Sequence, residues 1–197
     1  MERIKIYNAL RESTGSTITV TGWVRSFRAN RFIALNDGSC LTNLQIVLDF
    51  ENTEKEVLDN ISTGASIQVT GELVPSQGSG QKIELIAKSI RVLGNANPQE
   101  VQKTILQPKK HNLETLREQA HLRFRTNLFG AIFRIRHHMS FAVHNYFNDR
   151  GYYYIHTPII TGSDAEGAGE MFRVTTVKNT KNKYLPEEDF FGKETHL

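Results

Sequence analysis

The sequence has almost no cysteine and no long apolar segment. Cys40 is the only cysteine in 197 residues, which excludes an internal disulfide and a cysteine-rich metal site. No apolar run approaches the roughly 18–20 residues of a membrane-spanning helix. The charged N-terminus also lacks the apolar core of a signal peptide. With 39% hydrophobic and 23% charged residues, the chain has the composition of a soluble globular protein. We therefore expect a cytoplasmic protein of one medium domain or two small ones.

Charge is distributed unevenly along the chain. Residues 1–94 hold ten Lys/Arg and ten Asp/Glu, whereas residues 103–136 hold eight Lys/Arg against two Glu. Such a basic stretch suits a polyanionic partner. A solvated helix face with basic ends would give the same composition, so charge alone leaves both interpretations open.

The first half of the chain has the period-two alternation of β-strands, as in the alternating apolar residues Ile18, Val20 and Val24. Residues 52–61 interrupt it with a capped, one-sided apolar pattern that predicts a short helix. Five strands with a helix between the third and fourth match the OB-fold, a small barrel that binds oligonucleotides across its second and third strands. Strand number alone leaves other small barrels open. The predicted strands are residues 16–29, 31–37, 41–48, 66–74 and 82–93.

Strand parity separates a core face from an outer face. Ile33 shares its face with Leu35, so Phe32 points the other way. The same alternation turns Gln45 away from Leu44 and Ile46. An exposed aromatic side chain here can stack on an unpaired base, and an amide can read a base edge. The alternative is that Phe32 packs under a loop or against a second domain.

After the barrel the pattern changes to that of a linker and a helix. Residues 95–112 contain two prolines and little apolar periodicity, so we place a linker there. Residues 126–149 repeat apolar side chains at helical spacing over a broad stripe. Gly151 ends this predicted helix. The aromatic and β-branched residues 152–157 predict a strand that stops at Pro158.

Residues 127–160, a long helix followed by Gly-Tyr-Tyr-Tyr-Ile-His-Thr-Pro-Ile-Ile, resemble motif 1 of class II aminoacyl-tRNA synthetases. Residues 121–126 are similar to the entry to motif 1 in the aspartate, asparagine and lysine subgroup. The resemblance implies an α+β protein with an N-terminal OB-fold that binds the anticodon at residues 1–94. The linker and the start of an antiparallel-sheet catalytic domain, residues 113–197, would follow.

Within the subgroup, residues 163–172 resemble the amino-acid-site loop of bacterial asparaginyl enzymes, and residues 189–194 resemble another of their segments. The resemblance implies ATP-dependent activation of asparagine to an aminoacyl-adenylate and transfer to tRNA(Asn). An aspartyl-tRNA synthetase relative and a stand-alone OB-fold tRNA-binding module are the alternatives.

The resemblance also implies roles for particular residues. Glu166 matches the carboxylate that binds the α-amino group of the substrate, and Glu170 is a further candidate for that pocket. Phe32 is expected to stack on the central anticodon base, Gln45 to read an anticodon base, and Arg28 to contact the anticodon loop. A homodimer interface is expected on motif 1, at Ile132, Ile135, Met139 and Pro158.

Parts of the family pattern are missing from the sequence. No counterpart of motif 2 or of the motif 3 arginine occurs, so we name no catalytic residue and expect the residues that contact ATP and Mg²⁺ to lie outside the chain. The chain alone is predicted to be inactive in adenylation and to retain at most anticodon binding. His137, His138 and His144 lack the spacing of metal ligands, so no metal site is expected.

Overall fold

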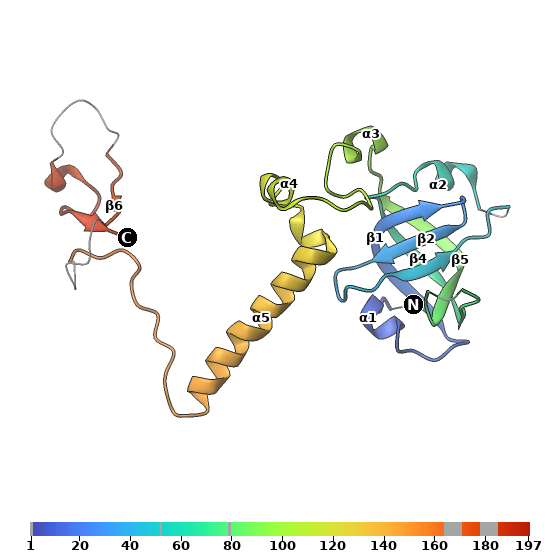
Figure 1. Cartoon of the computed structure of the whole chain (residues 1–197), viewed down its shortest axis with the longest axis horizontal. Coiled ribbons are helices and arrows are strands. Elements are labelled where there is room, and N and C mark those ends of the chain that lie inside the picture. Colours follow the sequence, from blue (N-terminus) through green and yellow to red (C-terminus); the bar gives the residue numbers. More distant parts are fainter. Residues whose placement is uncertain (1, 52, 79, 164–170, 178–184) are drawn as a thin grey trace. The chain divides into compact units, whose positions relative to one another are not determined.

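The computed structural model describes residues 2–51, 53–78, 80–163, 171–177 and 185–197. The chain divides into two compact units, Met1–Ser140 and Phe141–Leu197, and each is described by itself. Figure 1 shows the elements along the chain.

A closed five-stranded barrel fills most of the first unit (Figure 1). Its strands follow the order β1-β2-β3-β5-β4, and every neighbouring pair is antiparallel except β3 and β5. The short helix α2 (Lys55–Asp59) lies between the third and fourth strands in the sequence, which confirms the predicted OB-fold order. The strands are β1 (Thr17–Arg28), β2 (Phe32–Asn36), β3 (Leu44–Val47), β4 (Ser66–Pro75) and β5 (Ile83–Gly94).

Two local features let long strands close this barrel. The register of β1 against β2 shifts between Val24 and Ser26, which is a β-bulge that bends the strand. A Cβ added at Gly71 of β4 would lie 2.1 Å from the carbonyl oxygen of Ile86 on β5. Only glycine allows the two backbones to approach this closely.

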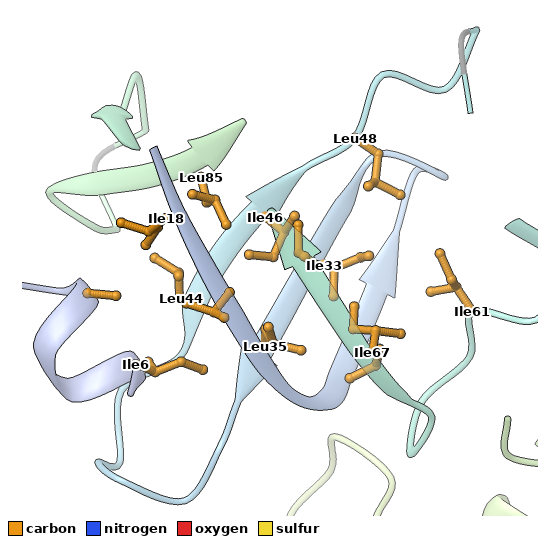
Figure 2. Close-up of a cluster of buried hydrophobic side chains, with 14 of the residues drawn as sticks. Ile6, Ile18, Ile33, Leu35, Leu44, Ile46, Leu48, Ile61, Ile67 and Leu85 are labelled. Atoms are coloured by element: carbon orange, nitrogen blue, oxygen red, sulfur yellow. The ribbon is translucent and has the colours of Figure 1, made fainter. Parts of the chain in front are cut away.

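The barrel core is built from the alternating apolar positions (Figure 2). Ile33 and Leu35 of β2 and Leu44 and Ile46 of β3 are fully buried, and the residues between them, Ala34 and Gln45, are not part of this cluster. Burial of a side chain of this size stabilises the fold by about 1.5–3 kcal/mol. The core is therefore the main source of stability in this unit.

Helix α1 (Ile6–Ala9) covers one end of the barrel with Ile6, which is fully buried. The carboxylate of Asp37, in the turn after β2, accepts a hydrogen bond of 3.0 Å from the backbone N–H of Ile6. Burial acts to raise the pKa of Asp37, but hydrogen bonds from Ser39 and Ile6 and the charge of Arg3 outweigh it and leave that pKa below its usual value. The carboxylate of Asp37 thus fixes the start of α1 against the turn after β2.

Short helices connect the barrel to a long one. They are α3 (Pro98–Val101), α4 (Leu113–Glu118) and the 3-10 turn η1 (Arg123–Arg125), followed by α5 (Asn127–Asn148). The side chain of Asn97 caps α3, and Val101 and Ile105 are buried. Helix α5 confirms the helix predicted at residues 126–149.

Much of the apolar stripe of α5 is exposed. Ile135 is 63% exposed and Met139 is 59% exposed, whereas Gly130 near the start of the helix is buried. Among the described residues, no helix is long and apolar enough to cross a membrane.

The strand predicted at residues 152–157 is wrong. This segment has no regular structure, and Tyr153 is 91% exposed. A strand needs a neighbour to pair its backbone groups, and no described residue pairs with 152–157. The pairing in this unit joins β6 (Arg173–Val174) to β7 (Thr195–His196), and Thr161 forms an isolated bridge with His196.

Candidate nucleic-acid interface

One outer face of the barrel collects side chains from four strands. Cross-strand partners point to the same side of a sheet, so the registers define this face. Arg28 of β1 pairs with Phe32 of β2, and Phe32 pairs with Val47 of β3. Gln45, two positions before Val47, lies on the same face and pairs with Glu84 of β5. None of the five belongs to the apolar cluster that fills the barrel, although Val47 and Glu84 are themselves buried.

Phe32 lies in the middle of this outer face and is half-buried. The guanidinium of Arg31 lies 5.6 Å from the centre of its ring, at a distance typical of a weak cation–π contact. Arg28 and Arg31 are both exposed. The ring therefore has two cations beside it that can pair with phosphate groups.

The turn between β1 and β2 holds Arg28 and Phe32 in this arrangement. Ala29 and Asn30 have φ values of 51° and 49°, in the left-handed region. The backbone N–H of Arg31 donates to the carbonyl of Arg28, and that of Leu48 donates to the carbonyl of Arg31. Alanine is unfavourable in the left-handed region, so the surrounding hydrogen bonds must stabilise this turn.

Glu84 organises the polar part of the face. Its Oε1 accepts hydrogen bonds from Gln45 Nε2 at 3.1 Å, from Gln81 Nε2 at 2.9 Å and from the hydroxyl of Ser76. Glu84 is only 8% exposed, so its charge is stabilised by these donors. The amide of Gln45 is thereby oriented, and no described donor contacts its carbonyl oxygen.

Glu84 is the residue that sequence reasoning missed. Its signal is present, because Glu84 precedes the buried Leu85 in a predicted strand and therefore points outward. The pairing of β5 with β3 is what brings it to Gln45, 39 residues earlier in the chain.

The other predicted site residues fall elsewhere. Glu166 and Glu170 lie outside the described residues. Ile132 on α5 is half-buried, whereas Ile135, Met139 and Pro158 are exposed. The described part of the chain brings no three His, Cys, Asp or Glu side chains together as a metal site.

Asp189 belongs to the C-terminal segment that resembles the asparaginyl enzymes. Its Oδ1 accepts hydrogen bonds from the backbone N–H of Thr176 at 2.9 Å, from the hydroxyl of Thr176 at 2.8 Å and from the N–H of Phe190 at 2.8 Å. Hydrogen bonds from Thr175 and Thr176 hold the pKa of Asp189 well below its usual range. This carboxylate ties residues 175–176 to residues 189–190.

Two family descriptions match the chain. Residues 18–93 match the OB-fold nucleic acid binding domain of the tRNA anticodon family, and residues 112–191 match the class II tRNA synthetases for D, K and N. Fold and sequence together thus relate the chain to the class II tRNA synthetases, with a nucleic-acid-binding barrel at residues 18–93.

The curated relatives narrow this class. The chain is 50% identical over 207 residues to an asparagine–tRNA ligase of Parabacteroides distasonis, covering 100% of this chain and 44% of the relative. It is 49% identical over 210 residues to that of Cytophaga hutchinsonii, with the same coverage. The chain belongs to the asparagine–tRNA ligase family. It spans less than half the length of these relatives.

Solved structures support the fold. The asparaginyl-tRNA synthetase of Pyrococcus horikoshii, complexed with asparaginyl-adenylate, superposes with a TM-score of 0.77 at 18% identity, over 100% of this chain and 42% of that one. The enzyme of Entamoeba histolytica gives 0.76, also at 18% identity and with the same coverage.

Proposed function

We propose that this protein serves in the ATP-dependent ligation of asparagine to tRNA(Asn), and that the outer face of the barrel binds the anticodon loop. The observation that carries the proposal is the row of Arg28, Phe32, Gln45 and Glu84 across four strands of a nucleic-acid-binding fold. The relatives reported above carry the asparagine name, which favours asparagine over the aspartyl alternative. Because they are more than twice as long as this chain, they also argue against a stand-alone binding module.

Each side chain of the row has a chemical role in this proposal. Phe32 stacks on an unpaired base. The amide of Gln45, oriented by Glu84, presents its carbonyl oxygen to a base N–H. Arg28 pairs with a phosphate of the loop and contributes affinity without sequence information.

The catalytic part of the proposal rests on family membership. Glu166 would pair with the ammonium group of asparagine, since a charged substrate group in a closed pocket needs a partner of opposite charge, and Glu170 would line the same pocket. ATP and Mg²⁺ are general requirements of the class. We assign no residue of this chain to either. The cytoplasmic location expected from the sequence stays a prediction.

A filter-binding titration of this chain tests the anticodon role. A tRNA with an asparagine anticodon is compared with the same tRNA carrying a different anticodon, using the unmodified chain and Phe32→Ala. Loss of stacking should weaken binding to the matching tRNA by about 1–3 kcal/mol, roughly 5- to 150-fold. The control is Tyr7→Ala, which removes an exposed aromatic ring on α1 at the other end of the barrel.

Binding that ignores the anticodon, or that Phe32→Ala leaves unchanged, contradicts the anticodon role. Glu84→Gln is a second test of the anticodon role. A neutral amide accepts the three hydrogen bonds more weakly than the carboxylate does, so Gln45 should be held less firmly. We expect this substitution to reduce discrimination between the two tRNAs more than total affinity.

We also propose that the apolar stripe of α5 with Ile132, Ile135 and Met139 is a self-association surface, and that Pro158, in the second unit, takes part in self-association too. Contiguous exposed apolar residues mark interaction sites. Met139→Asp should shift the chain toward monomer in sedimentation velocity, because burying a carboxylate in an apolar interface is costly. Ser140→Asp adds the same charge at the neighbouring exposed position and should change association less. Equal effects of the two substitutions would contradict this surface.

A further inference from the structure

A basic cavity lies in the first unit, between the barrel and the start of α5. Its volume is about 480 Å³. Five basic side chains line it together with the single tryptophan of the chain, and none of its lining residues is Asp or Glu. These six are Trp23, Arg25, Arg125, Arg134, His137 and His138.

Neutral groups, not carboxylates, hold the arginines of this cavity. Arg25 is the extra residue of the bulge in β1, and its side chain donates to the carbonyl of Arg125 and, at 3.4 Å, to Oδ1 of Asn127. The guanidinium of Arg125 lies 4.3 Å from the ring centre of Trp23. Arg134 donates to the carbonyls of Gly130, at 3.1 Å, and of Gly38. Among the described residues, none of these three arginines forms an ion pair.

The positive charges in this cavity repel one another. Burial lowers the pKa of Arg25, and burial together with the neighbouring charge of Arg25 lowers the pKa of Arg125. Asp37 stands between the lining residues Asn36 and Gly38 in the sequence, but it does not line the cavity itself. Its carboxylate accepts hydrogen bonds from the backbone N–H groups of Ile6 and Ser39. A bound anion would offset this repulsion.

A second cavity beside the first is also lined by basic side chains. It shares Arg25, Thr126 and Asn127 with the first and adds Lys109, Lys110 and His111, again with no Asp or Glu in its lining. Four of the eight Lys/Arg of residues 103–136 thus line the two cavities: Lys109, Lys110, Arg125 and Arg134. An extended anion with several charges fits two adjoining cavities better than a single small ion does.

We propose that the cavity lined by Arg25, Arg125 and Arg134 binds a phosphoryl oxyanion. Guanidinium groups present paired N–H donors that match phosphate oxygens. The source of the phosphoryl group is either a free polyphosphate or the phosphodiester backbone of RNA. The RNA source rests on the proposed function, whereas the free source does not.

Trp23 provides a direct assay for this site. It is the only tryptophan in the chain and contacts Arg125, so its fluorescence reports on the cavity. The 197-residue chain is titrated with inorganic tripolyphosphate and, separately, with sodium chloride at matched ionic strength. We expect a saturable change with tripolyphosphate only. A response that follows ionic strength equally for both salts overturns the proposal.

Substitutions then locate the binding. Arg125→Gln should weaken tripolyphosphate binding at least tenfold. Arg91→Gln removes an exposed arginine of β5 outside the cavity and should leave binding unchanged. Arg125 also contacts Trp23, so its substitution can change the fluorescence directly, and a second variant, His138→Glu, is needed. His138 is exposed, so a carboxylate there should repel the anion without unfolding the chain. Unchanged binding in His138→Glu and Arg125→Gln, with circular dichroism showing both folded, contradicts the site.

Competition distinguishes the two sources. If RNA supplies the phosphate, tripolyphosphate should displace tRNA, and Arg125→Gln should reduce the salt dependence of tRNA binding by about one ion. If the source is free polyphosphate, tripolyphosphate binds without displacing tRNA. Loss of the Phe32→Ala effect alone removes the anticodon role and leaves the tripolyphosphate titration standing, so the two proposals fail separately.

Discussion

The barrel and the helix α5 both have regular apolar patterns, but only the barrel buries its own. The alternating residues of β2 and β3 are fully buried, and the five strands pair with one another around a closed ring. On α5, Ile135 and Met139 follow helical spacing equally well and are more than half exposed. A closed barrel provides both faces of its core, whereas a single helix needs a surface from elsewhere. Periodicity therefore identifies an apolar face without showing what covers it.

Separating the two regions gives the largest expected effect. We expect residues 1–112 to unfold cooperatively in urea on their own, because the core cluster lies within the first 96 residues. Residues 113–197 should show no cooperative transition, since the apolar residues that the structure describes in this piece form no shared core. Circular dichroism during urea titration of both pieces and of the intact chain measures this. A cooperative transition in residues 113–197 would remove the contrast between the two regions.

Truncating one apolar residue in each region sharpens the comparison. Leu35→Ala should lower the free energy of unfolding by about 2–5 kcal/mol, because Leu35 is fully buried. Ile135→Ala removes a side chain that is 63% exposed and should change it by no more than about 0.5 kcal/mol. Urea denaturation of the two variants provides the values. A loss above about 2 kcal/mol for Ile135→Ala would mean that α5 is covered in solution.

An effect smaller than that of Leu35→Ala is expected at the glycine that lets the barrel close. Gly71→Ala would place its Cβ 2.1 Å from the backbone oxygen of Ile86, so β4 and β5 must move apart. We expect a loss of about 1–3 kcal/mol, and a melting temperature lower by roughly 2–4 °C per kcal/mol. Gly80→Ala is the control, because its Cβ would meet nothing within 4 Å. Similar melting temperatures for the two variants would contradict the closure argument.

Much of the fold was predictable because barrel strands and long helices have strong local patterns. The alternation around Ile33 and Leu35 placed β2 and its core face, and the helical spacing of Ile132 and Met139 placed α5. The strand prediction for residues 152–157 was wrong for a physical reason. Their aromatic and β-branched side chains favour extended backbone, but a strand exists only where a neighbour pairs with it.

The candidate site was predictable in part. Parity put Phe32 and Gln45 on the outer face from the sequence, and the registers place them there. The contribution of Glu84 depends on the pairing of β3 with β5, which no local pattern contains. The same holds for Arg25, whose direction follows from a bulge that interrupts the alternation of β1.

The sequence by itself determined which residues form the barrel strands, which face of each is apolar, and which family the chain resembles. Backbone geometry sets these properties within a few residues, because side chains alternate along a strand and repeat every 3.6 residues along a helix. Only the tertiary structure decided that Gln45 is oriented by Glu84 and that Arg25 and Arg125 share a cavity without a carboxylate. Barrel closure and the packing of η1 near β1 bring together residues that are 39 and 100 positions apart, and no local preference encodes such separations.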